Sequence, residues 1–172
     1  MSDRRNLHSP EMKTFLDRQH SVAGLMATLW ASTVKESPRY GKDLIDAQCY
    51  REGVRYAIAE IKSRTDMTMA ELQRRKDALF AEKKIKGGIA LAKEFKVPYV
   101  AVLYLVPDGE VIWWKVTDEK GELLLPPLRR WRGPVYQPMT GQMEMQDNVF
   151  LPMELRRHIL EVPDWIPLLQ SH

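Results

Sequence analysis

The sequence predicts an α/β fold in which a mixed central β-sheet is flanked by helices. Three observations lead to this prediction. An amphipathic helical pattern occupies the N-terminal part of the chain, two pairs of apolar strands are each joined by a short turn, and a second helical pattern separates the two pairs. Strands and helices in this order are typical of a sheet with helices packed on its faces.

Composition limits the classes of protein that the chain can belong to. Its 172 residues, of which 44% are hydrophobic and 28% charged, suit one domain with a core and are not typical of disorder. The net charge of +3 permits a polyanionic partner without requiring one. Cys49 is the only cysteine, which excludes an internal disulfide and a cysteine-rich zinc site. No run approaches the ~20 apolar residues that span a bilayer and the N-terminus has no apolar signal core, so we expect a cytoplasmic protein without membrane contact.

The N-terminal part of the chain predicts a helix followed by a β-hairpin. Residues 1–10 are polar and are expected to be flexible, and an apolar stripe with three- and four-residue steps predicts a helix over 11–33. Two short strands are expected at 44–50 and 54–62. Arg51-Glu52-Gly53 supplies the turn between them, because Gly53 can take a positive φ.

A second helical region and a second hairpin are expected after residue 68. Thr68-Met69-Ala70-Glu71 has the form of a capping box and predicts a helix over 69–83. An apolar helical face continues to about residue 96, where Gly87-Gly88 either breaks the helix or allows it to approach the sheet closely. Residues 99–106 are apolar on both faces and predict a central buried strand, which Asp108-Gly109 joins to a partner strand at 110–116.

The signal weakens after residue 120. Several prolines predict irregular chain there, and a short helix is expected over 151–160. We therefore expect a core domain over 11–120 and a C-terminal extension, 121–172, that packs on the same domain.

One charged tripeptide stands out because it closes an apolar strand. The pattern of an acidic residue, any residue and a lysine occurs five times, but only Glu60-Ile61-Lys62 follows a strand. The other four copies fall in predicted helix or loop, where a solvated charge pair is the ordinary explanation. Asp46 lies on the preceding strand of the same hairpin, so it can approach Glu60. Asp43 is a second candidate, but residues three apart in a strand face opposite sides, so only one of the two aspartates is expected to be a ligand.

Two converging carboxylates are the chemistry that Mg²⁺ or Mn²⁺ requires, because these cations prefer hard oxygen ligands. Asp46 and Glu60 would hold the metal ion, with the backbone carbonyl of Ile61 as a further ligand. A bound metal ion lowers the pKa of water and stabilises charge on a phosphate, which are the two needs of phosphodiester hydrolysis. Lys62 would then orient the attacking water or contact the phosphate.

Asp46 followed by Glu60-Ile61-Lys62 at the end of an apolar strand resembles the PD-(D/E)XK nuclease superfamily, whose fold is called restriction-endonuclease-like. The resemblance covers residues 11–116 and includes a helix before the aspartate, a helix after the lysine and then an apolar strand. It implies a mixed central sheet, dependence on Mg²⁺ and a nucleic-acid substrate, with DNA preferred. Ile45 stands where this family often has proline.

Further residues gain candidate roles from the same resemblance. The first helix of the family often supplies a glutamate near the metal, and here that role falls to Gln19 or, if the chain bends back, to Glu36. The family often has a glutamine or lysine on the following helix, which makes Gln73 and Lys76 candidates for nucleic-acid binding. Lys83, Lys84 and Lys86 form a second candidate phosphate track. The small size of the chain is compatible with a homodimer or with a subunit of a larger complex.

Non-catalytic functions for the chain, and purely structural roles for several residues, remain open. The chain could be a non-catalytic module of the same fold that binds nucleic acid or protein, or an assembly protein with incidental ion pairs. Trp113 and Trp114 occupy adjacent strand positions, so one is expected in the core and the other at its boundary, with stacking of an exposed ring on a base as the alternative. The Arg129–Arg132 segment suits contact with a nucleic-acid backbone, but equally a disordered basic linker or a protein-binding tail.

Overall fold

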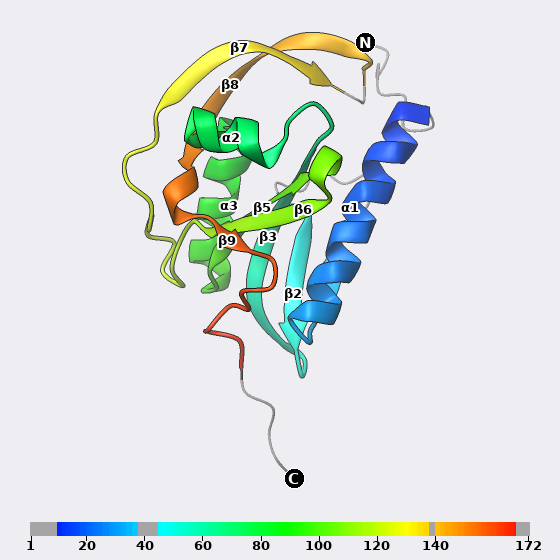
Figure 1. Ribbon diagram of the computed structural model, residues 1–172. Helices are drawn as coiled ribbons and strands as arrows, with labels where there is room; N and C mark the ends of the chain where they lie inside the picture. Colours follow the sequence, from blue (N-terminus) through cyan, green and yellow to red (C-terminus); the bar gives the residue numbers. More distant parts are fainter. Residues whose placement is uncertain (1–9, 38–44, 138–139, 168–172) are drawn as a thin grey trace, which may run out of the picture.

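The computed structural model describes residues 10–37, 45–137 and 140–167. At its centre is a six-stranded sheet with the order β1-β2-β3-β5-β6-β9. β3 and β5 run parallel and the other neighbouring pairs antiparallel, so the sheet is mixed, as the sequence predicts (Figure 1). Its strands are β1 (Thr33–Glu36), β2 (Ala47–Arg51), β3 (Val54–Arg64), β5 (Tyr99–Leu105), β6 (Glu110–Lys115) and β9 (Arg157–His158).

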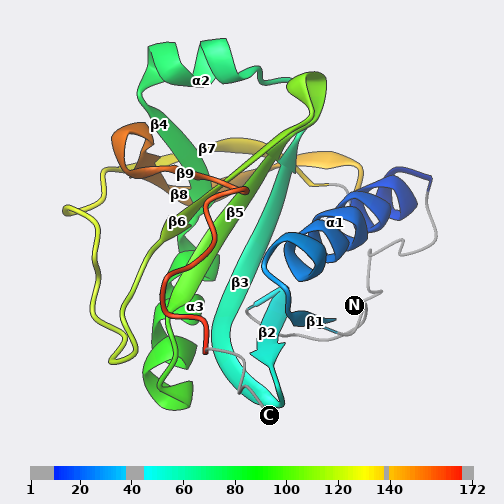
Figure 2. The same ribbon diagram turned by 60° about the horizontal axis from the view of Figure 1, so that its bottom comes forward.

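Two helices cover opposite faces of this sheet (Figure 2). α1 (Pro10–Leu29) packs on the face that carries Ala59 and Ile61, and α3 (Glu82–Phe95) packs on the face that carries Ile58. Because successive strand residues point to opposite faces, each face has its own apolar cluster. Each charged side chain at the end of β3 must therefore face either α1 or α3.

The first helix ends earlier than the sequence predicts. The apolar stripe predicts helix through residue 33, but α1 ends at Leu29 and Ala31 takes a left-handed φ of 47°. Thr33–Glu36 then forms β1, an unpredicted edge strand that pairs antiparallel with β2. The β-branched side chains of Thr33 and Val34 favour the extended conformation over another helical turn.

The region predicted as a helix over 69–83 contains a strand. Thr68 caps the short helix α2 (Met69–Arg75) as expected, but Lys76 takes a left-handed φ of 67° and ends it. β4 (Asp77–Ala81) follows and pairs antiparallel with β8 (Gln142–Pro152). Because its partner lies far along the chain, this strand is stabilised by a non-local pairing that helix propensity does not reveal. α3 then runs without a break through Gly87 and Gly88.

Residues 121–129 form no helix or strand, as the prolines predict, but from Arg130 the chain forms a long hairpin rather than irregular structure. β7 (Arg130–Gln137) pairs with β8, and the two join β4 in a second sheet with the order β4-β8-β7. Pro134 is tolerated because β7 is the edge strand of this sheet, where a missing N–H removes no ladder hydrogen bond. The hairpin arches over the upper end of the main sheet (Figure 1).

Tryptophans attach the C-terminal segment to the core, and the helix expected over 151–160 does not form. The indole N–H groups of Trp30, Trp113 and Trp114 donate to backbone carbonyls of the segment 152–161 at 3.0, 3.1 and 2.8 Å. These carbonyls are turned toward the core rather than along a helix axis, and the segment forms a 3₁₀ turn (Met153–Leu155) and β9. Trp113 and Trp114 are both fully buried, so neither lies at the boundary of the core and neither is available to stack on a base.

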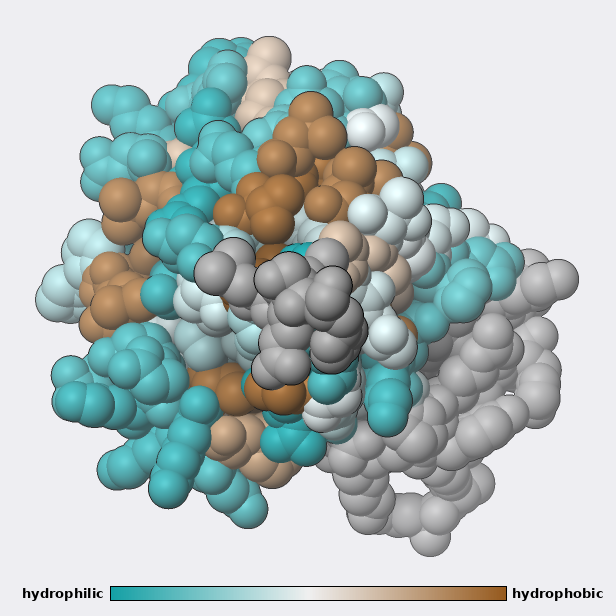
Figure 3. All heavy atoms as spheres, turned by 90° about the horizontal axis from the view of Figure 1, so that it is seen from below, coloured by the Kyte–Doolittle hydropathy of each residue, from teal (hydrophilic) through white to brown (hydrophobic). Residues whose placement is uncertain are grey.

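No helix in the described part of the chain is long and apolar enough to cross a membrane. Seen from below in Figure 3, the visible apolar residues form separate groups between hydrophilic ones. The β2–β3 turn lies at this lower end of the sheet in Figure 1. Asp46 and Glu60 lie farther from that turn along the two strands.

Candidate metal centre

Asp46 and Glu60 face each other across the β2–β3 ladder because of a one-residue register shift. Near the turn Arg51 pairs with Val54, but the register shifts between Cys49 and Tyr50, and Ala47 pairs with Ala59. Continuing this register brings Asp46 opposite Glu60, and the Asp46 N–H donates to the Ala59 carbonyl at 2.9 Å. Without the shift, Asp46 would lie opposite Ala59 and its side chain would point to the α1 face. This register shift, a β-bulge, therefore turns the Asp46 side chain toward Glu60.

Ile61 is held by Asp46 through its backbone. The Ile61 N–H donates to Asp46 Oδ2 at 2.7 Å, and Asp46 comes immediately before the first residue of β2. In a strand the N–H and C=O of one residue point to the same edge, so the Ile61 carbonyl lies on the Asp46 side of β3. Two carboxylates and one carbonyl, the ligand set expected from the sequence, are therefore gathered at one strand edge.

Lys84 lies between the two carboxylates. Its Nζ is 3.6 Å from Asp46 Oδ1 and 3.8 Å from Glu60 Oε2. The side chain of Glu60 is 10% exposed and that of Asp46 16%, whereas that of Lys84 is 35% exposed. The cluster is consequently open to solvent on the lysine side. Lys84, expected from the sequence to contact phosphate, instead bridges the acidic pair.

Lys62 points away from the carboxylates. Its Nζ donates to the Leu79 carbonyl of β4 at 2.6 Å and lies 5.5 Å from the centre of the Phe80 ring. Burial, and then the nearby charge of Arg64, lowers the Lys62 pKa to about 8. Lys62 therefore joins β3 to β4, and β4 leads directly into α3, which carries Lys84.

None of the accessory candidates within the described residues is brought to the carboxylate pair. Gln19 is buried on α1, one turn before Val22, on the opposite face of the sheet. Glu36 is bonded to His20 at 2.6 Å. Asp43 lies outside the described residues. On the helices that follow, Gln73 and Lys76 are exposed at the end of α2, and Lys86 pairs with Glu82 at 2.8 Å.

The donor set fits a hard divalent cation that keeps several of its waters. In the described part of the chain, no three His, Cys, Asp or Glu residues converge on one point, so the candidate ligands are two carboxylates and a carbonyl. Mg²⁺ is commonly held by one or two carboxylates, with water and substrate phosphate completing an octahedron. Glu60 Oε2 is buried and accepts no hydrogen bond, and a cation is a partner that satisfies such an oxygen.

No family model matches the chain, and no curated protein matches it at a significant level.

Tyr99, which sequence reasoning missed, and Gly88 lie where α3 packs on the sheet beside the site. Tyr99 pairs with Ile58 across the β3–β5 ladder, and a β-carbon on Gly88 would overlap its ring. Burial, and then the charges of Glu60 and Asp46, raises the Tyr99 pKa well above its ordinary value, so the phenol stays neutral. Gly88 thus lets α3 approach the sheet closely, one of the two readings that the sequence left open.

The charges of the cluster are interdependent. Burial, followed by the negative charge of Asp46, raises the Glu60 pKa well above its ordinary range, and Lys84 acts in the opposite direction. Burial opposes the charge of Lys84, but the two carboxylates outweigh it and raise the Lys84 pKa. The ionised Glu60 is therefore stabilised chiefly by a neighbouring cation.

In metal-free buffer, the free energy of unfolding should fall as pH rises above the ordinary glutamate pKa of 4.5. The folded protein keeps the Glu60 proton to higher pH than the unfolded chain, so it binds more protons in this range and loses stability as they leave. Glu60→Gln has no such proton and should show a flatter profile. Urea titrations of both proteins between about pH 5 and about pH 7, below the range in which Lys62 titrates, measure the difference. Parallel profiles would contradict the buried-carboxyl assignment.

Proposed function

We propose that this chain is a metal-dependent nuclease that hydrolyses phosphodiester bonds in nucleic acid, with DNA as the preferred substrate. The observation that carries the proposal is the convergence of Asp46 and Glu60 on one cation, Lys84 Nζ, at 3.6 and 3.8 Å. A catalytic Mg²⁺ or Mn²⁺ requires carboxylates that can bind one cation together at a position open to solvent. The two carboxylates on adjacent strands have this arrangement.

The order of elements supports membership of the PD-(D/E)XK superfamily and a restriction-endonuclease-like fold. A helix precedes Asp46, a hairpin carries Asp46 and Glu60, and another helix leads to β5, which runs parallel to β3. The position of Glu60 and Lys62 toward the end of β3 also supports the proposal.

Each residue of the cluster has its own role in the proposed mechanism. Asp46, Glu60 and the Ile61 carbonyl would hold the metal ion, which when bound activates a water and stabilises charge on the phosphate. Asp46 also fixes the Ile61 amide, which keeps the strand edge in place. Lys84 is the most exposed member, so it is free to turn from the carboxylates to a phosphate oxygen once another cation takes its position. Lys62 acts as a positioning residue, because its bond to Leu79 holds β4 and thereby the start of α3.

A second function is favoured by the same lysine. Lys84 already neutralises both carboxylates, so the cluster is stable as an ion-paired support without any metal. In that case the chain is a non-catalytic module that binds nucleic acid or protein on the same fold. The two functions differ in whether a divalent cation displaces the lysine.

The deciding experiment is a cleavage assay on linear, circular, single-stranded and branched DNA, and on RNA, with Mg²⁺, with Mn²⁺ or with a chelator. Cleavage of DNA in the presence of either metal ion and none with chelator is expected. Binding without cleavage under every condition supports the module instead. Cleavage that persists in chelator contradicts the metal mechanism.

A further inference from the structure

Trp131 differs from the other four tryptophans of the chain. Trp30, Trp113 and Trp114 are fully buried, Trp165 is half-buried, and each donates its indole N–H to a backbone carbonyl. Trp131 is 43% exposed, and its indole N–H has no partner in the described part of the chain. A large aromatic surface and a hydrogen-bond donor are thus presented to solvent together.

The indole is seated on its own strand. Trp131 and Gly133 point to the same face of β7, and a β-carbon on Gly133 would overlap the Trp131 ring. Gly133 is buried although it lies on an edge strand, because the indole covers it. The ring is therefore held in a fixed position, and ordering it costs a ligand little entropy.

Two arginines line the same recess as this ring, although Arg130 and Arg132 alternate with Trp131 along β7 and leave the strand on its other face. Trp131 lines a recess of about 260 Å³ together with Glu82, Arg130, Arg132, Asp147 and Asn148. Arg130 Nη2 contacts Glu82 at 2.7 Å and Arg132 Nη1 contacts Asp147 at 3.1 Å. A guanidinium has five N–H donors, so each arginine is oriented by its carboxylate and retains donors for a phosphate. These ion pairs also mean that the segment Arg129–Arg132 is an ordered part of the second sheet rather than a disordered linker.

The recess lies close to the candidate metal centre. Glu82 lines the recess and Lys84 bridges Asp46 and Glu60, and both belong to the first turn of α3. Two residues along a helix correspond to about 3 Å of rise. Side chains two residues apart on a helix point in nearly opposite directions, so the two features lie near the start of α3 on different sides of it.

We propose that Trp131 is a stacking platform for an unpaired base of single-stranded nucleic acid, whose backbone Arg130 and Arg132 hold. The identity of the ligand rests on the proposed nuclease function. An aromatic face flanked by cations is the chemistry that binds single strands, since every base has a π-face and every nucleotide a phosphate. Bases inside a duplex are already stacked on each other, so the site selects single strands or unpaired ends.

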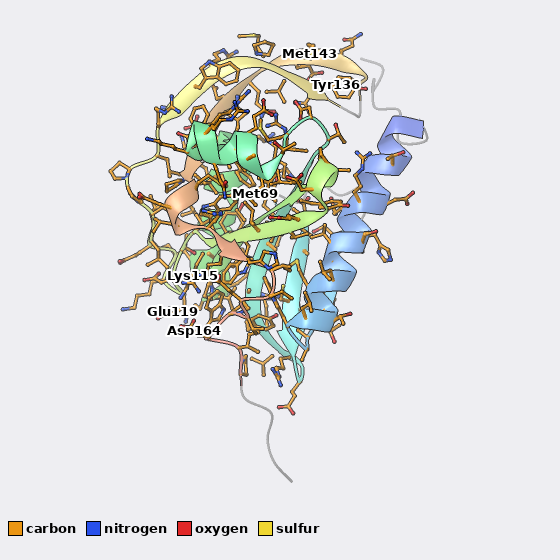
Figure 4. All side chains as sticks on the ribbon, viewed as in Figure 1. Met69, Lys115, Glu119, Tyr136, Met143 and Asp164 are labelled. Atoms are coloured by element: carbon orange, nitrogen blue, oxygen red, sulfur yellow. The ribbon has the colours of Figure 1, made fainter. Side chains whose placement is uncertain are left out.

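Fluorescence anisotropy with a labelled single-stranded oligonucleotide, in chelator so that no cleavage occurs, tests the proposal. Trp131→Ala should weaken binding about tenfold, and Trp131→Phe, which keeps a stacking ring, should stay within about threefold of the wild type. Tyr136→Ala is the matched control: Tyr136 is 48% exposed on the same hairpin, farther toward its tip, and does not line the recess (Figure 4). It should bind as the wild type does. A duplex of equal length should respond little to any of these changes.

A second readout does not depend on a change in affinity. Stacking should quench the fluorescence of the wild type. Trp131→Phe should abolish this quenching, because Trp30, Trp113 and Trp114 are fully buried, and Trp165 is half-buried with its N–H bonded to a backbone carbonyl. Gly133→Ala keeps Trp131 but displaces it, and should weaken single-strand binding at least threefold. This variant tests the proposal even if Trp131→Ala fails to fold. The proposal is overturned if Trp131→Ala or Gly133→Ala binds single strands with wild-type affinity, or if quenching persists in Trp131→Phe. It is also overturned if the variants lose as much affinity for duplex as for single strands, or if the wild type binds no single strand. Cleavage by the wild type with Mg²⁺ is measured separately, so the nuclease function stands or falls independently.

Discussion

Asp46→Asn is expected to abolish cleavage while leaving the protein folded. Asparagine has the same shape and keeps an oxygen that can accept the Ile61 N–H, so the strand edge survives. It loses the charge that a divalent cation requires, and loss of a bound metal ion removes several kcal/mol of transition-state stabilisation. The cleavage rate with Mg²⁺ should therefore fall at least about a thousandfold.

The control for this variant is Asp66→Asn. Asp66 follows the same strand, β3, and pairs with Arg64 at 2.9 Å, but it is exposed and distant from Glu60 in the ladder. Its variant should cleave at the wild-type rate. Thermal unfolding supplies an independent measure, because Mg²⁺ or Mn²⁺ should stabilise the wild type by about 2.7 kcal/mol at a hundred times its Kd and should not stabilise Asp46→Asn. A metal-dependent rise that persists in Asp46→Asn would remove Asp46 from the ligand set.

Lys84→Met should separate metal binding from cleavage. Without the ammonium, two neighbouring carboxylates lack their shared partner, so the metal-free variant should lose about 1 kcal/mol of stability, a modest value because the lysine is partly exposed. The metal ion no longer competes with Lys84 and should bind more tightly than in the wild type. Cleavage should still fall about a hundredfold, because the lysine is not there to contact the phosphate.

Isothermal titration with Mn²⁺ and cleavage rates measured on the same samples test this combination. Lys93→Met is the matched control, since Lys93 is exposed in the last turn of α3 and forms no ion pair with another described residue. A Lys84→Met variant that is less stable, binds no Mn²⁺ and behaves otherwise like the wild type would favour the non-catalytic module. Full cleavage activity would remove the lysine from the mechanism.

The acidic pair could be anticipated from the sequence because its geometry is local. Glu60 and Asp46 lie on strands joined by a short turn, and Glu52 and Gly53 take the positive φ values, 51° and 76°, that such a turn requires. The register shift between Cys49 and Tyr50 was not predictable from the pattern, although it determines which face Asp46 occupies. The expectation of proximity therefore rested on strand pairing alone.

The part played by Lys84 could not be anticipated because it depends on distant segments. Lys84 reaches the carboxylates only because α3 begins after β4, and β4 exists because it pairs with β8 about seventy residues later. The C-terminal segment is likewise fixed by indole N–H bonds, such as that of Trp30 to the carbonyl of Ile159. Periodicity reports which face of an element is apolar, but it carries no information on such non-local partners.

A crystal soaked in Mn²⁺ and measured for anomalous scattering tests the central claim most directly. A single peak is predicted at the site now taken by Lys84 Nζ, ligated by Asp46 Oδ1, Glu60 Oε2 and the Ile61 carbonyl, with the lysine turned aside. If Lys84 remains between the two carboxylates and no anomalous peak lies beside them, the metal centre and the nuclease mechanism built on it are contradicted.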